Sequence, residues 1–204
     1  MYLKFEKHGE ENLTDRIATL VKRVRTLEDE LEEEFDRHRS EYRYRLERGR
    51  VVFEHDIRQR HKALKQKLSS YLTEARPLVV LTAPVIYSLI IPFILLDVFV
   101  TIYQVICFPT YRIKKVRRAD YITFDRKHLS YLNGLEKLNC MYCSYGNGLL
   151  AYCVEIAART EKHWCPIKHA RHMAGRHAHY PEFVEYGDAE GFQHTKQASH
   201  DATK

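Results

Sequence analysis

Proline is missing from the first 76 residues of this 204-residue chain, and Gly9 and Gly49 are the only glycines there. Without these breakers, little in that part of the sequence predicts turns or loops. The N-terminus lacks the apolar stretch of a signal peptide. The sequence also lacks a phosphate-binding loop, a dinucleotide fingerprint, a Ser-His-Asp pattern and a His-Glu-x2-His zinc motif, so no reaction is predicted from such patterns.

Residues 1–76 are polar and predict one long amphipathic helix. Their apolar residues recur with an eleven-residue period, about 3.67 residues per turn. The repeating pairs are Leu20 and Val24, Leu31 and Phe35, Tyr42 and Leu46, Phe53 and Ile57, and Leu64 and Leu68. We expect a continuous coiled-coil-like helix from about residue 11 to residue 76, with a fold-back at Gly49 into a helical hairpin as the alternative.

The narrow apolar stripe of this helix needs a covering partner. We therefore expect self-association, with a protein partner along the helix as a further possibility. Residues 1–76 hold 18 Lys and Arg against 16 Asp and Glu, a net charge of +2, which argues against nucleic acid as the partner.

Residues 77–111 predict a membrane-embedded segment. Lysine, arginine and glutamate are missing from residues 77–108, and Asp97 is the only charge. A straight helix over residues 78–108 would be about 46 Å long, which exceeds the ~30 Å hydrocarbon core. Two topologies stay open: a re-entrant hairpin bent near Pro92 and a single tilted span. Basic residues on both flanks favour the cytoplasmic side for both ends.

Asp97 is costly in lipid, and we expect it to have a partner. The options are a neighbouring copy of the chain, a hydrogen bond from Thr101 or Tyr103, or protonation. A basic stretch follows the apolar segment and is expected to bind anionic lipid headgroups, although a topology signal explains it equally well. Its members are Arg112, Lys114, Lys115, Arg117 and Arg118.

Four of the five cysteines fall within residues 140–165. This clustering favours metal binding or redox chemistry in a reducing compartment over a disulfide framework. We expect a short helix capped by Asp125, then a loop that carries the first cysteine pair beside Gly146 and Gly148. A second helix is expected to end before Pro166.

The predicted metal ligands are Cys140, Cys143, Cys165 and His169, a Cys-x2-Cys pair followed by a Cys-x3-His pair. Two such pairs can supply the four ligands of a tetrahedral zinc ion. Cys153 in place of His169 would give an all-cysteine site for iron or an iron–sulfur cluster. A Cys-x2-Cys redox pair without metal is a further alternative.

The stretches "NCMYCSYGNGLLAY", "EIAARTEKHWCPIKHAR" and "FVEYGDAEG", within residues 120–191, resemble an uncharacterised family of small bacterial membrane proteins. The resemblance implies a bacterial inner-membrane setting with the soluble parts in the cytoplasm. It implies no activity.

Together these patterns predict a mainly α-helical chain in four parts. They are the long helix of residues 1–76, the membrane segment of residues 77–111, a Cys/His module of residues 112–180 and a polar, mobile tail of residues 181–204. The predicted function is a membrane-anchored, zinc-binding scaffold that binds lipid and forms a homo-oligomer. The alternative is a membrane-bound iron or zinc metalloenzyme or redox protein.

Overall fold

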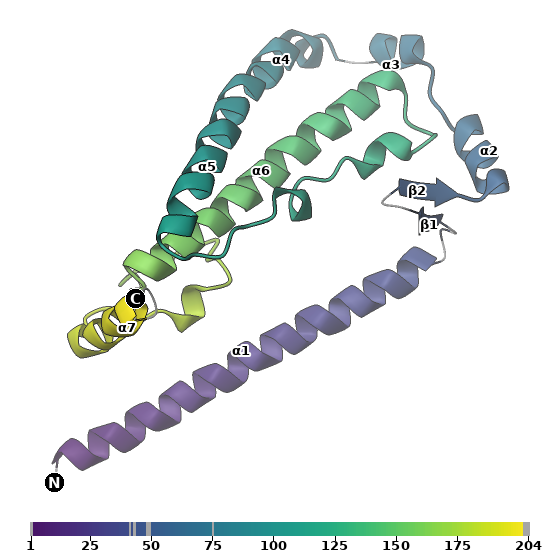
Figure 1. Ribbon diagram of the computed structural model, residues 1–204. Helices are drawn as coiled ribbons and strands as arrows, with labels where there is room; N and C mark the ends of the chain where they lie inside the picture. The colour runs from purple at the N-terminus through teal and green to yellow at the C-terminus, as the bar shows by residue number, and fades with distance from the viewer. Residues whose placement is uncertain (1, 41, 43, 48–49, 75, 202–204) are drawn as a thin grey trace. The chain divides into compact units, whose positions relative to one another are not determined.

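The computed structural model describes residues 2–40, 42, 44–47, 50–74 and 76–201 and is mainly helical, as predicted (Figure 1). The chain divides into two compact units, Met1–Gln59 and Arg60–Lys204, whose boundary falls inside α2 (His55–Ala63). The apolar segment and all the predicted site residues belong to the second unit.

The first unit contains a long helix followed by a β-hairpin. α1 covers Tyr2–Ser40. β1 (Tyr44–Glu47) pairs antiparallel with β2 (Arg50–Phe53), so that Tyr44 lies opposite Phe53 with 5.7 Å between ring centroids.

The prediction of one helix up to residue 76 was wrong, because the helix ends at Ser40. Val51, Val52 and Phe53 are β-branched and aromatic residues that favour a strand over a helix. Phe53 falls on the eleven-residue period of the predicted helix, so the period alone misled the prediction. The alternative of a helical hairpin was also wrong, since strands lead into and out of the reversal; Gly49 itself lies outside the described residues.

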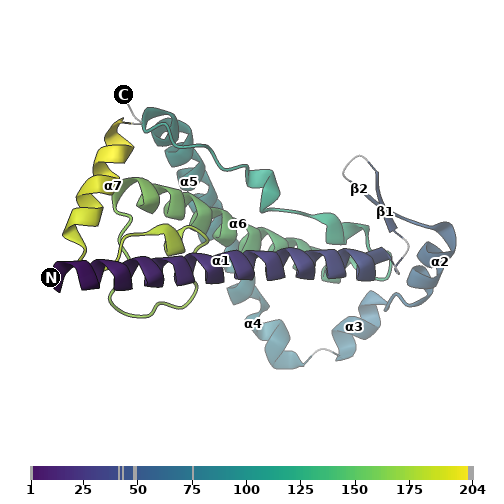
Figure 2. The same ribbon diagram turned by 90° about the horizontal axis from the view of Figure 1, so that it is seen from below.

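The apolar segment forms a nearly continuous helix after α3 (Leu68–Glu74). α4 (Pro77–Ser88) and α5 (Ile90–Thr110) are joined by Leu89, whose backbone keeps right-handed helical angles of φ −63° and ψ −13°. The two helices follow one another along one path in both views (Figures 1 and 2). Over Pro77–Thr110 the helix is long and apolar enough to cross a membrane.

The predicted re-entrant hairpin at Pro92 was wrong. Pro92 is the third residue of α5, within the first turn, where a backbone amide needs no intrahelical partner. The amide of Phe93 donates to the carbonyl of Leu89 at 3.2 Å, so the helix resumes at once.

A linker, residues 111–133, reverses the chain after α5. The amide of Ile113 donates to the Phe108 carbonyl at 2.8 Å, and that of Arg112 donates to the Pro109 carbonyl at 3.2 Å. This is the Schellman pattern, with Arg112 in the left-handed conformation at φ 54°. The linker includes the short helices η1 (Arg118–Asp120) and η2 (Asp125–His128).

α6 (Gly134–Trp164) runs in the same direction as α5 and packs against it (Figure 1). Tyr87 donates to Asn139 near its start, and Gln104 bonds to Tyr152 further along. Asn133 caps α6 by accepting from the amides of Leu135 and Glu136, in a capping box. The buried core lies where α5, the linker and α6 meet and consists of Phe108, Val116, Ile122, Leu149, Tyr152 and Ile156.

α6 replaces the two predicted helices and the loop between them, so the predicted loop was wrong. The predicted helix end before Pro166 is confirmed, because α6 ends at Trp164. Gly146 and Gly148 are buried helix residues that permit close packing, not turn residues. A Cβ atom at Gly146 would lie 2.9 Å from the Phe93 ring, and one at Gly148 would lie 2.5 Å from the Tyr121 carbonyl oxygen.

After α6, Ile167 and Val184 form a parallel β-bridge, and η3 (Tyr180–Glu182) lies just before Val184 in the chain. The segment predicted as a polar tail contains α7 (Ala189–Asp201). The amide of Gly191 donates to the Asp188 carboxylate at 2.8 Å, which satisfies a donor in the first turn of α7.

Candidate functional site

Asp97 on α5 is bound by side chains from the linker and from α6. Arg118 donates through Nη2 to Oδ2 at 2.6 Å and through Nε to Oδ1 at 3.1 Å, and the Tyr145 hydroxyl donates to Oδ2 at 3.0 Å. Thr101, one of the expected partners, lies about one helical turn from Asp97 on α5. Tyr103, another, lies instead 3.0 Å from the Thr160 hydroxyl.

This cluster neutralises the charge of the apolar helix within the fold. The hydrogen bond to Asp97 raises the pKa of the Arg118 guanidinium above its ordinary value. The carboxylate is 14% exposed and the guanidinium 44% exposed, so the pair lies at the edge of the core. Arg118 and Tyr145 were missed as partners of Asp97 because neither is near it in sequence.

A second polar contact, made by Gln104, joins the same three segments. Gln104 is 5% exposed, donates through Nε2 to the Tyr152 hydroxyl at 2.8 Å, and accepts from the amide of Val116 at 2.5 Å. The side chain of Gln104 thus supplies the hydrogen-bond acceptor that the buried backbone amide of Val116 needs. Gln104 lies seven residues after Asp97 on the same helix face, a spacing that the sequence could have revealed.

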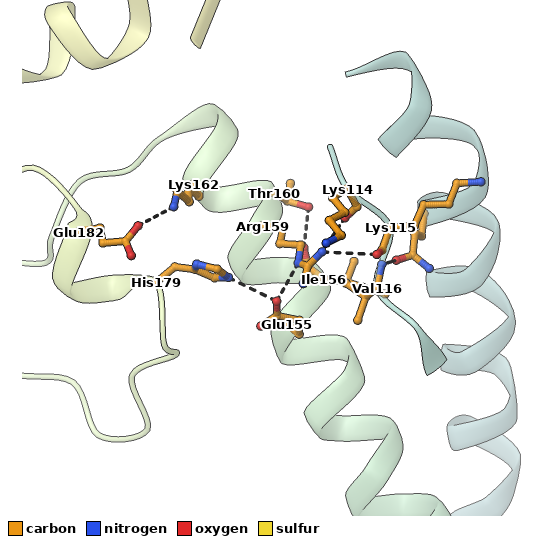
Figure 3. Close-up of polar contacts among 11 residues, drawn as sticks. Lys114, Lys115, Val116, Glu155, Ile156, Arg159, Thr160, Lys162, His179 and Glu182 are labelled. Carbon is orange, nitrogen blue, oxygen red and sulfur yellow. Dashed lines mark hydrogen bonds and ion pairs between the residues drawn. The ribbon is translucent and has the colours of Figure 1, made fainter. Parts of the chain in front are cut away.

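Arg159 on α6 holds the start of the linker (Figure 3). Its Nη1 donates to the Lys114 carbonyl at 2.7 Å, and its Nε donates to Glu155 Oε1 at 2.7 Å. His179 Nε2 lies 3.3 Å from the same carboxylate oxygen. Burial alone would raise the pKa of Glu155, but the hydrogen bonds from Arg159 and His179 outweigh burial and lower it.

A cavity of about 430 Å³ opens beside this cluster. Its wall contains the cations Lys114, Arg159 and Lys162 and the anion Glu182. Lys162 Nζ lies 2.5 Å from Glu182, and Arg159 is held by Glu155, so these charges are largely neutralised within the protein. The arrangement stabilises the junction of α6, the linker and η3, and no described side chain in it is set up as a nucleophile beside a base.

The predicted headgroup-binding residues all have exposed side chains. Arg118 is engaged by Asp97, and Arg117 Nε lies 3.7 Å from Asp120, a weaker exposed pair. Lys114 and Lys115 offer their carbonyls to Arg159. Headgroup binding stays a prediction for this stretch.

The four predicted metal ligands do not come together. Cys140 and Cys143 lie in the first half of α6, whereas Cys165 caps its C-terminal end. A continuous helix separates Cys140 from Cys165 by 25 residues, or about 38 Å. His169 lies beyond the helix, where its amide donates to the Tyr180 hydroxyl at 2.7 Å.

The all-cysteine alternative also lacks a common site, because Cys153 is 13 residues, or about 20 Å, along the helix from Cys140. Cys153 is half-buried, and burial raises the pKa of its thiol. Within the described residues, no group of three or more His, Cys, Asp or Glu side chains is placed to hold a metal ion. The ligand prediction depended on turns at Gly146 and Gly148 that the helix does not make.

Comparisons with protein-family models, with curated proteins and with solved structures found no match to this chain. The family resemblance of the cysteine-rich stretches therefore stays a prediction.

Proposed function

We propose that the protein is a membrane-associated scaffold, anchored by α4 and α5, that self-associates through α1. The observation that carries the proposal is the exposed apolar surface of the helix Pro77–Thr110: none of the residues in its most apolar 18-residue stretch is fully buried within the protein. Its large exposed residues include Leu78, Leu81, Val85, Ile91, Leu95, Phe99, Ile102 and Ile106.

An apolar surface of this extent needs a covering. Each large apolar side chain moved out of water contributes about 1.5–3 kcal/mol, and soluble monomers rarely expose a contiguous patch beyond a few hundred Å². Lipid chains cover such a surface, and the exposed basic stretch beside α5 suits anionic headgroups.

The scaffold part of the proposal is supported by α1. Its exposed apolar residues Ile17, Leu20, Val24, Leu27 and Leu31 are spaced alternately by three and four residues. This spacing places them along one side of the helix, as in the a and d positions of a coiled coil. A second copy of α1 is the proposed occupant of this stripe.

The test of membrane association is flotation of the full-length protein with lipid vesicles. We expect the wild type to float and to stay bound in high salt, because apolar contacts dominate. Leu95→Asp together with Phe99→Asp is expected to release it, whereas Leu27→Asp in α1 is not. Wild-type protein that stays in solution and does not float with the vesicles would contradict the proposal.

The metal-dependent functions are not part of this proposal, since the described residues bring no ligand set together. An inner-membrane location with cytoplasmic soluble parts stays a prediction from the basic flanks and the family resemblance.

A further inference from the structure

We propose that α4 and α5 lie in the plane of an anionic bilayer surface instead of crossing the bilayer. The inference rests on the membrane association proposed above and specifies its geometry. The partner is the headgroup and upper acyl-chain region of one leaflet.

The first argument is the path of the linker. After α5 ends at Thr110, the linker returns along the helix: Val116 bonds to Gln104, and Arg118 bonds to Asp97. Asp97 is 13 residues before Thr110, so Arg118 lies about 20 Å back along the helix. Charged linker residues therefore accompany the apolar helix to near its middle.

The second argument compares possible spans. A transmembrane helix needs about 20 apolar residues. A 20-residue stretch of Pro77–Thr110 that has Asp97 well inside it also carries Arg118 into the hydrocarbon. Buried charges at that depth are costly, and here the guanidinium is still 44% exposed on the protein surface.

Only stretches at or next to residues 77–96 leave Asp97 outside the hydrocarbon or at its boundary, and α6 blocks that choice. Tyr87, at the centre of this stretch, donates to Asn139 on α6. Glu136 and Lys137 lie within one helical turn of Asn139 and would enter the bilayer near its centre. No full span is therefore free of charges from the packed neighbours.

The third argument is that α5 has two distinct faces. Phe93, Asp97, Val100, Gln104 and Phe108, spaced by three or four residues, pack against the linker and α6 or bond to them. The opposite side exposes Leu81, Ile91, Leu95, Phe99 and Ile106. The linker and α6 thus take the place, along α5, of the polar face that an interfacial amphipathic helix has.

Length agrees with this geometry. The 34 residues of the helix extend over about 51 Å, well beyond the ~30 Å core. In the membrane plane no part of it has to leave the apolar layer, and the exposed lysines and arginines of the linker stay at headgroup level.

The test uses tryptophan fluorescence, since Trp164 is the single tryptophan of the chain. In a Trp164→Phe background, Leu81, Ile91, Leu95, Phe99 and Ile106 are each replaced by Trp in the full-length protein. Binding to vesicles of phosphatidylcholine and phosphatidylglycerol is measured first, and depth is then obtained by quenching with lipids brominated at different acyl positions. Tyr186→Trp, also exposed, is the control outside the helix.

We expect all five tryptophans at one shallow depth, about 5–10 Å into the boundary region, with the control unquenched. A crossing helix would give depths that change by up to about 1.5 Å per residue, and this result would overturn the in-plane geometry while leaving membrane association intact. Absence of both binding and quenching would overturn both proposals and point to a protein covering the apolar face.

The anionic preference has its own variant. Lys114→Gln with Lys115→Gln is expected to weaken binding to the phosphatidylglycerol vesicles by roughly 10- to 30-fold. Their carbonyl bonds to Arg159 do not involve the side chains that are changed. Unchanged binding, or equal wild-type binding to purely zwitterionic vesicles, would overturn the anionic part of the proposal.

Discussion

Gly148 sets how closely α6 approaches the linker. A Cβ atom there would meet the Tyr121 backbone oxygen at 2.5 Å, and backbone yields less readily than a flexible side chain. We expect Gly148→Ala to lower the free energy of unfolding by about 1–3 kcal/mol, measured by thermal unfolding in detergent.

Gly134 provides the matched control, because a Cβ atom there would meet nothing within 4 Å. Gly134→Ala at the start of the same helix is expected to be neutral or to stabilise by up to about 1 kcal/mol. Equal losses at both positions would argue against close packing as the role of Gly148.

Glu155 is expected to make the free energy of unfolding fall at acidic pH. Its folded-state pKa lies below its unfolded value, so its contribution is complete above the unfolded pKa and is lost as pH falls through the folded pKa. Glu155→Gln should therefore cost about 1–3 kcal/mol at pH 7, with the difference from wild type shrinking below about pH 4.5. Denaturant unfolding at several pH values measures it.

Glu182→Gln is the control for Glu155. Its pair with Lys162 is about half exposed, so a cost below about 1 kcal/mol is expected. A Glu155→Gln cost that stays constant down to pH 3 would contradict the assigned linkage.

For single residues, the sequence identified positions such as Asp97 that need a partner, but it did not identify the residues that they contact. Asp97 is the only acid in an apolar stretch, so the sequence predicted that it needs a partner. Arg118 and Tyr145 reach it only because the linker runs back along α5 and α6 packs beside it. Cys140 and Cys165 were predicted as ligands from the Cys-x2-Cys and Cys-x3-His spacings, and Gly146 and Gly148 suggested a turn at the first pair. In the structure, close packing requires glycine at residues 146 and 148.

Among the elements, the contact of α5 with the linker depends on Asp97 and Arg118. Asp97→Asn or Arg118→Gln alone is expected to cost about 1–2 kcal/mol, because the remaining charge loses its partner while staying partly exposed. The double variant should cost less than the sum of the two. A double-mutant cycle of unfolding free energies measures the coupling, and strict additivity would contradict a direct interaction.

α1 is expected to lose self-association when its stripe is made polar. Leu27→Glu with Leu31→Glu should shift the solubilised protein toward monomer by light scattering, because each change places a charge in the apolar contact. Lys22→Gln and Asp29→Gln, outside the stripe, should leave the oligomer unchanged. Unaltered mass in the Leu27 and Leu31 variant would exclude α1 as the contact.

Helical content and the apolar segment could be predicted from composition and from the scarcity of breakers. The end of α1 at Ser40 could not, because Phe53 falls on the helical period and fits a strand equally well until β1 supplies a partner. Similarly, Pro92 predicted a bend, but its effect depends on whether it falls in a first turn or in a helix interior.

For the whole molecule, the in-plane anchor predicts that both termini lie on the same side of the membrane. Reporters fused to the N-terminus and to the C-terminus should both report the same side of the membrane, since a helix in the membrane plane does not cross the bilayer. Opposite sidedness would require a crossing of the bilayer. The basic flanks gave the same expectation, so this measurement tests the topology independently of depth.

The parallel order of α5 and α6 also has a consequence for biosynthesis. Gln104 and Tyr152 are 48 residues apart, so the helix that covers the inner face of α5 is made roughly 2–10 s after it at ordinary elongation rates. During that interval Asp97 lacks Tyr145 and Gln104 lacks Tyr152. The nascent chain therefore has to hold a bare apolar helix at the ribosome, and early contact with a lipid surface or a chaperone would decide whether synthesis ends in folding or in aggregation.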